Sequence, residues 1–307
     1  MPKINISRSK HIDASPEKIF SILSDFNHWP AWSPWLIMEP ETKVTVREDS
    51  KYYEWKGSRI GEGNMTITDE VENESINYDL MFLTPWKSES KVRFVIKPSG
   101  SGCEVTWFMD GSLPFFMFWM KKMMESFVGM DYERGLNLLK EYIEDGAVKS
   151  KLEFKGESNY PGTHYVGVKT TCAMDEMGDK MTADLGKLHD YKSSHEGSSF
   201  GDVFSIYHKW DMVKRRVSYT SCLGVEKISG DLPNGMIAGE VPATKVYTLR
   251  HVGPYEHLGN AWSTLNAMQR GKEFKHTKSI HPFEIYVNDP QEVSSEELIT
   301  DIHFPVK

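Results

Sequence analysis

Pro282-Phe283-Glu284-Ile285-Tyr286-Val287-Asn288-Asp289-Pro290, near the end of the chain, has the alternating pattern of a β-strand. Side chains alternate between the two faces of a strand, so Phe283, Ile285 and Val287 share one face. Glu284 and Tyr286 share the other face. A purely structural strand has no need of a carboxylate beside a phenol, although most Glu side chains are exposed to solvent. This second face therefore has two interpretations, a solvated surface or the wall of a pocket.

The composition indicates two domains of ordinary size. The chain has 307 residues, of which 39% are hydrophobic and 26% are charged. That length is enough for two separate hydrophobic cores. The formal net charge is −8, and no basic run stands out that could neutralise phosphates. A nucleic-acid partner is therefore not expected.

The start of the chain and its cysteines favour a cytoplasmic protein. Residues 1–6 alternate with polar residues and lack the apolar core of a signal peptide. No apolar run approaches the roughly 20 residues that span a bilayer, so no membrane partner is expected. Cys103, Cys172 and Cys222 are odd in number and widely spaced, which argues against a disulfide framework.

The first half of the chain predicts a helix lying across a curved antiparallel sheet. Ser15, Pro16 and Glu17 form a helix start with an N-cap, a proline in the first turn and an acid. Short alternating segments with turn signals then run from residue 43 to residue 111, which is typical of a meander. A helical pattern follows from residue 113 to about residue 146. The space between such a helix and sheet either holds a ligand or is filled by large side chains.

Two segments of this half resemble a known superfamily. They are Asp13-Ala14-Ser15-Pro16-Glu17-Lys18-Ile19-Phe20 and Asp25-Phe26-Asn27-His28-Trp29-Pro30-Ala31-Trp32-Ser33-Pro34. They are similar to the opening of the SRPBCC, or START-like polyketide cyclase, superfamily. The resemblance implies a helix-grip domain over residues 1–147 with a hydrophobic cavity. It implies no single activity, because members bind lipids, hormones or polyketides, catalyse reactions, or act as co-chaperones.

Aromatic residues in this half have more than one interpretation. Trp29, Trp32 and Trp35 either line the mouth of a cavity or form an aromatic cluster under the helices. The segment Leu113–Met120 is apolar on almost every side. We expect it to fill the core, with an adaptable gate or a membrane-touching surface as alternatives.

The second half of the chain repeats itself with an offset of about 80 residues. Residues 165–168, 175–189, 204–207 and 216–225 correspond to residues 246–249, 255–268, 283–286 and 298–306. Each set reads as strand, helix, strand, strand, so we expect two such units about a pseudo-twofold axis. The polar residues 146–159 before the repeat are interpreted as a connector containing the domain boundary.

Three motifs of this half resemble a second family. They are Gly253-Pro254-Tyr255, the E-x-Y-x-N-D-P stretch 284–290, and the terminal segment Asp301-Ile302-His303-Phe304-Pro305-Val306. Together they are similar to the GyrI-like small-molecule-binding domain, over residues 158–307. That family shares its fold with effector-binding domains of multidrug-responsive transcription regulators. The expected fold class is therefore α+β, a helix-grip antiparallel sheet domain followed by a pseudo-twofold strand–helix–strand–strand repeat domain.

The GyrI-like resemblance implies that Glu284 projects into a pocket between the repeats, with Tyr286 beside it. A carboxylate among aromatic walls attracts cationic or polarised aromatic ligands. Burial would also raise its pKa and suit it to acid or base chemistry. Ser205 stands at the matching position of the first repeat, so the copies are not equivalent. The other candidate ligand-binding residues are Tyr207, Trp210, Tyr255 and Trp262.

The leading hypothesis is binding of small hydrophobic molecules, aromatic or cationic, in a carboxylate-bearing pocket. One alternative is a hydrolase that uses Glu284 and Tyr286 to detoxify electrophilic molecules of the cyclopropanoid kind. Another is a protein-interaction module of the gyrase-inhibitor or co-chaperone kind. No metal-ligand spacing, P-loop, dinucleotide fingerprint or nucleophile elbow is present, so no metal or cofactor is expected. An SRPBCC-like domain stands where relatives carry a DNA-binding helix-turn-helix, which argues against direct transcription regulation.

Overall fold

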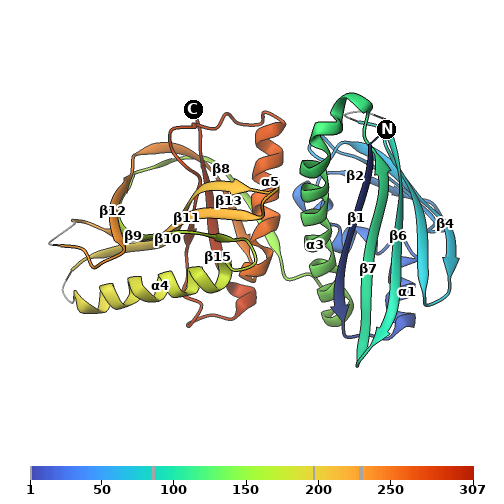
Figure 1. The fold of residues 1–307 in the computed structure, drawn as a ribbon, viewed down its shortest axis with the longest axis horizontal. Helices are drawn as coiled ribbons and strands as arrows, with labels where there is room; N and C mark the ends of the chain where they lie inside the picture. Colours follow the sequence, from blue (N-terminus) through green and yellow to red (C-terminus); the bar gives the residue numbers. More distant parts are fainter. Residues whose placement is uncertain (1, 85–86, 196–197, 228–230) are drawn as a thin grey trace. The chain divides into compact units, whose positions relative to one another are not determined.

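The fold is α+β and has two compact units, Met1–Lys149 and Ser150–Lys307 (Figure 1). The computed structural model describes residues 2–84, 87–195, 198–227 and 231–307. The first unit contains a sheet of seven strands and the second a sheet of eight, both antiparallel. Within the described ranges, no helix is long and apolar enough to cross a membrane.

The first unit is a meander of strands with one long helix packed against it. Its strands are β1 (Lys3–Ile12), β2 (Lys43–Val46), β3 (Tyr52–Lys56), β4 (Glu62–Val71), β5 (Ser75–Phe82), β6 (Ser88–Ser99) and β7 (Gly102–Ser112). Its helical segments are α1 (Pro16–Leu23), α2 (Trp29–Trp32), η1 (Leu36–Met38), η2 (Phe115–Met120) and α3 (Lys121–Asp145). The strand order is β1-β7-β6-β5-β4-β3-β2, so each strand from β2 to β6 pairs with the next along the chain, and β7 also pairs with β1. This is the predicted helix-grip arrangement.

Local chemistry sets the ends of the helices in this unit. The Ser15 hydroxyl accepts a hydrogen bond from the Lys18 N–H at 3.4 Å and so caps α1, as the sequence predicts. Helix α3 ends at Gly146, whose φ of 82° lies in the left-handed region that glycine adopts without strain.

Aromatic side chains occupy the space between α3 and the sheet. Trp107 of β7 stacks on Tyr132 of α3, with ring centroids 3.9 Å apart. Trp29 and Trp32 are buried and pack edge-on against Trp107. Trp35 is half-buried and packs against the same ring. The structure therefore favours the aromatic cluster over the cavity mouth for these tryptophans.

The segment Leu113–Met120 does not fill the core, and this prediction is wrong. Leu113 is buried and Met117 packs on the core, but four large side chains point outward. They are Phe115, Phe116, Phe118 and Trp119, which are 77%, 73%, 62% and 69% exposed. The segment forms the short 3₁₀ helix η2, and α3 begins only at Lys121. A run that is apolar on every side cannot bury all its faces in a short helix of six residues at the end of a sheet.

The second unit has pseudo-twofold symmetry. Its strands are β8 (Lys151–Tyr160), β9 (Thr163–Ala173), β10 (Phe200–Asp211), β11 (Arg216–Val225), β12 (Met236–Val241), β13 (Thr244–Val252), β14 (Phe283–Tyr286) and β15 (Ile299–Pro305). Its helical segments are α4 (Met177–Ser194), η3 (Tyr255–His257), α5 (Leu258–Arg270) and η4 (Ser295–Glu297). The strand order is β12-β9-β11-β10-β14-β15-β13-β8. Exchanging the two repeats, so that β9, β10 and β11 take the places of β13, β14 and β15 and β12 that of β8, leaves this order unchanged when it is read from the other end. The predicted strand–helix–strand–strand repeat is confirmed, with β10 and β14 at its centre.

Two edge strands, β8 and β12, complete the sheet. The presence of β8 shows that the sequence interpretation of residues 146–159 as a connector is wrong in part. Residues 146–159 do not form a connector throughout, because Lys151–Tyr160 form β8, paired with β13 of the second repeat. Strand β12 pairs in the same way with β9 of the first repeat. Each repeat therefore receives its edge strand from the segment that precedes the other repeat.

Strand β14 is shorter than the sequence pattern indicates. Phe283 and Ile285 are buried, as expected, but Val287 is 45% exposed because the strand ends at Tyr286. Glu284, on the opposite face, is only 1% exposed. The solvated interpretation of that face is therefore wrong for Glu284.

Candidate ligand-binding site

Four candidate residues share one face of the two central strands. Ser205 of β10 lies directly opposite Glu284 of β14 in the antiparallel register. Because the period of a strand is two, Tyr207 and Tyr286 lie on the same face as this pair. Helix α4 packs over β9 and β11, and α5 packs over β13 and β15. The four side chains therefore lie on the central strands between the two helices.

Glu284 is the hub of the hydrogen bonds on this face. Its Oε1 accepts a hydrogen bond from the Tyr207 hydroxyl at 2.5 Å and another from the Tyr286 hydroxyl at 2.8 Å. Its Oε2 accepts a hydrogen bond from Nε1 of Trp262, on α5, at 2.8 Å. The Ser205 hydroxyl lies 3.0 Å from the Tyr286 hydroxyl and extends the network into the first repeat.

Burial shifts the pKa values of this network. Removal from water raises the pKa of Glu284 above its ordinary value, while its three hydrogen-bond donors act in the opposite direction. Burial, together with the neighbouring carboxylate, raises the pKa values of Tyr207 and Tyr286 well above the usual range. Both phenols therefore stay protonated near neutral pH and remain hydrogen-bond donors.

Aromatic rings surround the carboxylate. Trp210 stacks on Tyr207 with centroids 5.2 Å apart, and Trp262 meets Tyr207 edge-on at 4.8 Å. Tyr255 meets Tyr286 edge-on at 5.6 Å. Trp210, Trp262, Tyr255 and Tyr286 are only half-buried, so the cluster joins a buried acid to aromatic surface that water reaches. The structure thus brings together all seven candidate residues named from the sequence.

Sequence reasoning missed Met181 of α4. Its sulfur lies 3.2 Å from the Tyr286 hydroxyl and 3.9 Å from the Ser205 hydroxyl. The internal repeat carries a signal that could have identified it, because an offset of about 80 residues places Met181 opposite Trp262. The two helices therefore contribute unlike groups, a thioether from α4 and an indole N–H from α5.

A second buried acid in this unit was also missed. Asp184 of α4 is 4% exposed, and its Oδ2 accepts hydrogen bonds from the hydroxyls of Thr170 at 2.5 Å and Tyr219 at 3.4 Å. Unlike Glu284, it also forms an ion pair, with the Lys187 Nζ 3.2 Å from its Oδ1. The two acids are similarly buried, but within the described ranges only Asp184 forms an ion pair with a cationic side chain.

The groups around Glu284 suit an organic ligand better than a metal ion. They are phenols, indoles, a hydroxyl and a thioether, whereas divalent cations prefer several carboxylate, imidazole or thiolate ligands. A lone carboxylate with aromatic neighbours can instead accept a hydrogen bond or attract an organic cation.

Family models match both units. Residues 3–144 match the model described as polyketide cyclase / dehydrase and lipid transport. Residues 159–307 match the model described as GyrI-like small molecule binding domain. The chain therefore consists of an SRPBCC-type domain followed by a GyrI-like domain, and the identification made from its motifs is confirmed. Small-molecule binding is the general property that these domains indicate.

Solved structures are similar to parts of the chain at low identity. An EcmrR–DNA complex is 19% identical with a TM-score of 0.44, covering 62% of this chain and 69% of that one. The EcmrR C-terminal domain is 20% identical with a TM-score of 0.43, covering 52% of this chain and 98% of that one. Protein CV1439 from Chromobacterium violaceum is 16% identical with a TM-score of 0.35, covering 46% and 96%. No curated protein matches the chain.

Proposed function

We propose that the GyrI-like domain binds a small, mainly hydrophobic molecule, aromatic or cationic, and that Glu284 orients its charged or polarised group. One observation carries this proposal. Glu284 is buried and accepts three hydrogen bonds, yet no Lys, Arg or His among the described residues forms an ion pair with it. An ionised carboxylate in such a place lacks a counter-charge, and a cationic ligand would supply one.

The hydrogen bonds of Glu284 leave one acceptor site of its carboxylate unused. A carboxylate offers about four lone-pair sites, and the three donors use three of them. Oε1 has two donors and Oε2 has one, so the remaining site belongs to Oε2. A ligand N–H that reached this oxygen would fill the site, and a cation beside it would supply the missing charge.

The aromatic rings would supply the rest of the affinity. Indole and phenol faces attract cations through their quadrupoles and also bury apolar surface. Trp210, Trp262 and Tyr255 are half-buried and so offer such surface beside the acid. A planar aromatic or lipophilic cation suits this combination better than a small hydrophilic ion.

A thermal-shift comparison with a size-matched pair of ions tests the proposal. Tetraphenylphosphonium and tetraphenylborate have nearly the same shape and opposite charges. A ligand at about a hundred times its Kd adds about 2.7 kcal/mol of stability. We expect tetraphenylphosphonium to stabilise the wild type and Asp184→Asn, and not Glu284→Gln. Equal stabilisation of all three proteins, or stabilisation by the borate alone, would contradict the proposal.

Glu284→Gln is a conservative test because the site can hold an amide. Its oxygen can accept from Nε1 of Trp262, and its NH₂ can donate to the hydroxyls of Tyr207 and Tyr286. Phenol oxygens accept as well as donate, so no donor is left facing another donor. Asp184→Asn is the matched control, because it removes a buried acid that already has a cation.

A second candidate function is hydrolysis of an electrophilic small molecule. The observation that favours it is the 2.8 Å contact between the Tyr286 hydroxyl and the Glu284 carboxylate. The carboxylate of an acid with a raised pKa is a stronger base and can take a proton from water, and a protonated phenol can donate a proton to a leaving group. Incubating the protein with a cyclopropane-bearing electrophile tests this function. Loss of turnover in both Glu284→Gln and Tyr286→Phe would support hydrolysis, and absence of turnover in the wild type would leave binding alone.

The same proposal includes a cytoplasmic location and no nucleic-acid partner. All three cysteines are free, which suits a reducing compartment. The net charge of −8 opposes binding to phosphates.

A further inference from the structure

We infer that the η2 end of the SRPBCC-type domain docks on an anionic lipid surface, a role independent of the ligand proposed for Glu284. The sequence leads us to expect no membrane partner, but that expectation concerns spanning segments. Insertion at a bilayer interface needs only a short apolar surface with suitable charges beside it.

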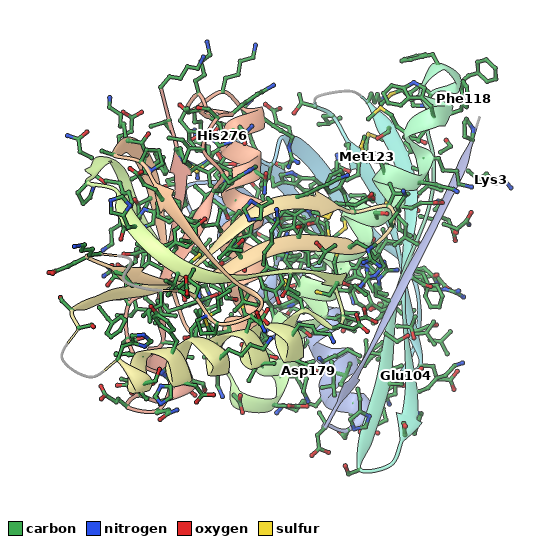
Figure 2. All side chains as sticks on the ribbon, turned by 60° about the vertical axis from the view of Figure 1, so that its left-hand side comes forward. Lys3, Glu104, Phe118, Met123, Asp179 and His276 are labelled. Carbon is green, nitrogen blue, oxygen red and sulfur yellow. The ribbon has the colours of Figure 1, made fainter. Side chains whose placement is uncertain are left out.

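The apolar part of this surface is formed by four aromatic side chains. Phe115, Phe116, Phe118 and Trp119 are each more than 60% exposed, and no other described segment exposes so many large apolar side chains in a row. Phe115 and Phe118 lie three residues apart on the 3₁₀ helix and meet with centroids 6.4 Å apart. Figure 2 shows Phe118 at one end of its own domain.

The charges that follow the aromatic side chains directly in the sequence are basic, against the acidic trend of the chain. Lys121 and Lys122 follow η2 directly, and no Asp or Glu occurs from Gly111 to Met124. Lys3 pairs in register with Ser112 and is exposed at the same end of the sheet (Figure 2). Lys121 lies 3.7 Å from Glu125, while Lys122 is exposed. Lysines beside exposed aromatics complement anionic headgroups.

Part of the backbone of the segment forms its own hydrogen bonds. Its helical turn closes its own hydrogen bonds, such as the Met117 N–H to the Pro114 carbonyl oxygen at 2.9 Å. Between Leu113 and Met120 no side chain carries a hydrogen-bonding group except the Trp119 indole. Hydrocarbon cannot form hydrogen bonds with polar groups, so a segment with few such groups enters it at a low cost in free energy. A specific protein interface would instead need about one hydrogen bond for every 100–200 Å².

A second copy of the chain fits this surface less well. Pairing two copies through this small surface would bring the lysines of both copies, Lys121 and Lys122, into one interface without adding an acidic partner from the segment 111–124, and like charges repel. Anionic lipid is therefore the occupant that both the aromatic and the basic groups favour.

Vesicle flotation with the full chain tests this inference. Vesicles of phosphatidylcholine alone and of phosphatidylcholine with phosphatidylserine serve as probes. We expect the wild type to bind the anionic vesicles and to be released by salt. The F115S/F116S/F118S/W119S variant should lose at least about tenfold of this binding, and K121E/K122E should lose the preference for anionic lipid. Circular dichroism checks that these surface variants fold.

Val71→Ser is the matched control. Val71 is also exposed, at 46%, in the same domain but at the opposite end of the sheet, and its replacement should change nothing. Wild-type protein that floats with neither vesicle, or an aromatic variant that binds like the wild type, would overturn the inference. A concentration-dependent dimer without vesicle binding, lost in the aromatic variant, would also overturn it and assign the surface to a second copy. Equal wild-type binding to both vesicles would contradict the role of the lysines.

Discussion

At the scale of single residues, the contrast between Glu284 and Asp184 defines the site. Both are buried acids of one domain, but Asp184 has Lys187, whereas Glu284 has only neutral donors among the residues that the structure describes. Neutral hydrogen-bond donors lower the free-energy cost of burying a carboxylate, but they do not supply a counter-charge. The uncompensated acid is therefore the one that we associate with a ligand.

Replacing Trp262 by Phe should weaken this support. The change removes the N–H that donates to Oε2 of Glu284, so we expect a loss of about 1–3 kcal/mol in the free energy of unfolding. The pKa of Glu284 should rise further, because this N–H holds it down. Denaturant unfolding and an NMR titration of the carboxyl carbon measure the two effects.

Trp210→Phe is the control for that change. Nε1 of Trp210 is buried and has no hydrogen-bond partner among the described residues, although its ring stacks on Tyr207. Its replacement should leave the pKa of Glu284 unchanged. If both variants shift that pKa equally, the hydrogen bond from Trp262 is not what holds it down.

The raised pKa of Glu284 also predicts a pH dependence of stability. Between the ordinary value of 4.5 and the raised value, the folded protein holds a proton that the unfolded chain has released. The contribution of Glu284 to stability is therefore present at low pH and declines as pH rises through this window. Compared with the wild type, Glu284→Gln should lack this decline in urea unfolding measured across the window. Parallel curves for the two proteins would contradict burial of an ionisable Glu284.

Residue-level prediction from the sequence succeeded where strand periodicity applies. The period of two placed Glu284 and Tyr286 on one face, and the repeat offset matched Ser205 to Glu284, which the structure shows to lie opposite each other in the register of β10 and β14. It failed for Met181 and Asp184, because which face of a helix meets the sheet centre depends on packing across both repeats. It also failed for Phe118, since a uniformly apolar segment gives no periodic signal of direction.

At the scale of elements, β8 determines at which residue a fragment of the second domain must begin in order to fold stably. Its Leu152 and Phe154 pack on the core of the second repeat, and its backbone pairs with β13 from Thr244 to Val252. The proposed boundary at residue 158 removes most of this strand. We expect the fragment 150–307 to melt cooperatively at a higher temperature than the fragment 158–307. Equal melting temperatures would show that β8 adds nothing to the fold and would favour the later boundary.

The sequence did not reveal β8 because edge strands carry polar residues. One edge of such a strand faces water, and charged side chains there prevent association with other sheets. Lys151, Glu153 and Lys155 alternate with Leu152 and Phe154, and the lysines lie within 3.2 Å of the Glu153 carboxylate. The charges resemble those of a linker, while the two apolar residues are too few to identify a strand.

At the scale of the whole molecule, the two units should respond differently to acid. His208, His251 and His303 all lie in the second unit, and burial lowers the pKa of each to about 4. In the unfolded chain these histidines bind protons near pH 6.5, whereas in the folded unit they stay neutral until about pH 4. The second unit therefore loses stability as pH falls from about 6.5 to about 4. We expect calorimetry to show the second unit losing thermal stability in this window while the first unit changes little. A parallel loss in both units would contradict this account.

The measurement that tests the central claim most directly is calorimetric titration of tetraphenylphosphonium into the wild type and Glu284→Gln at several pH values. We predict that the wild type binds with an affinity that falls as pH drops below the raised pKa of Glu284. Glu284→Gln should bind at least about tenfold more weakly at neutral pH and show no such pH dependence. Equal affinity of the two proteins, at every pH, would contradict the claim that Glu284 is the group that receives the ligand.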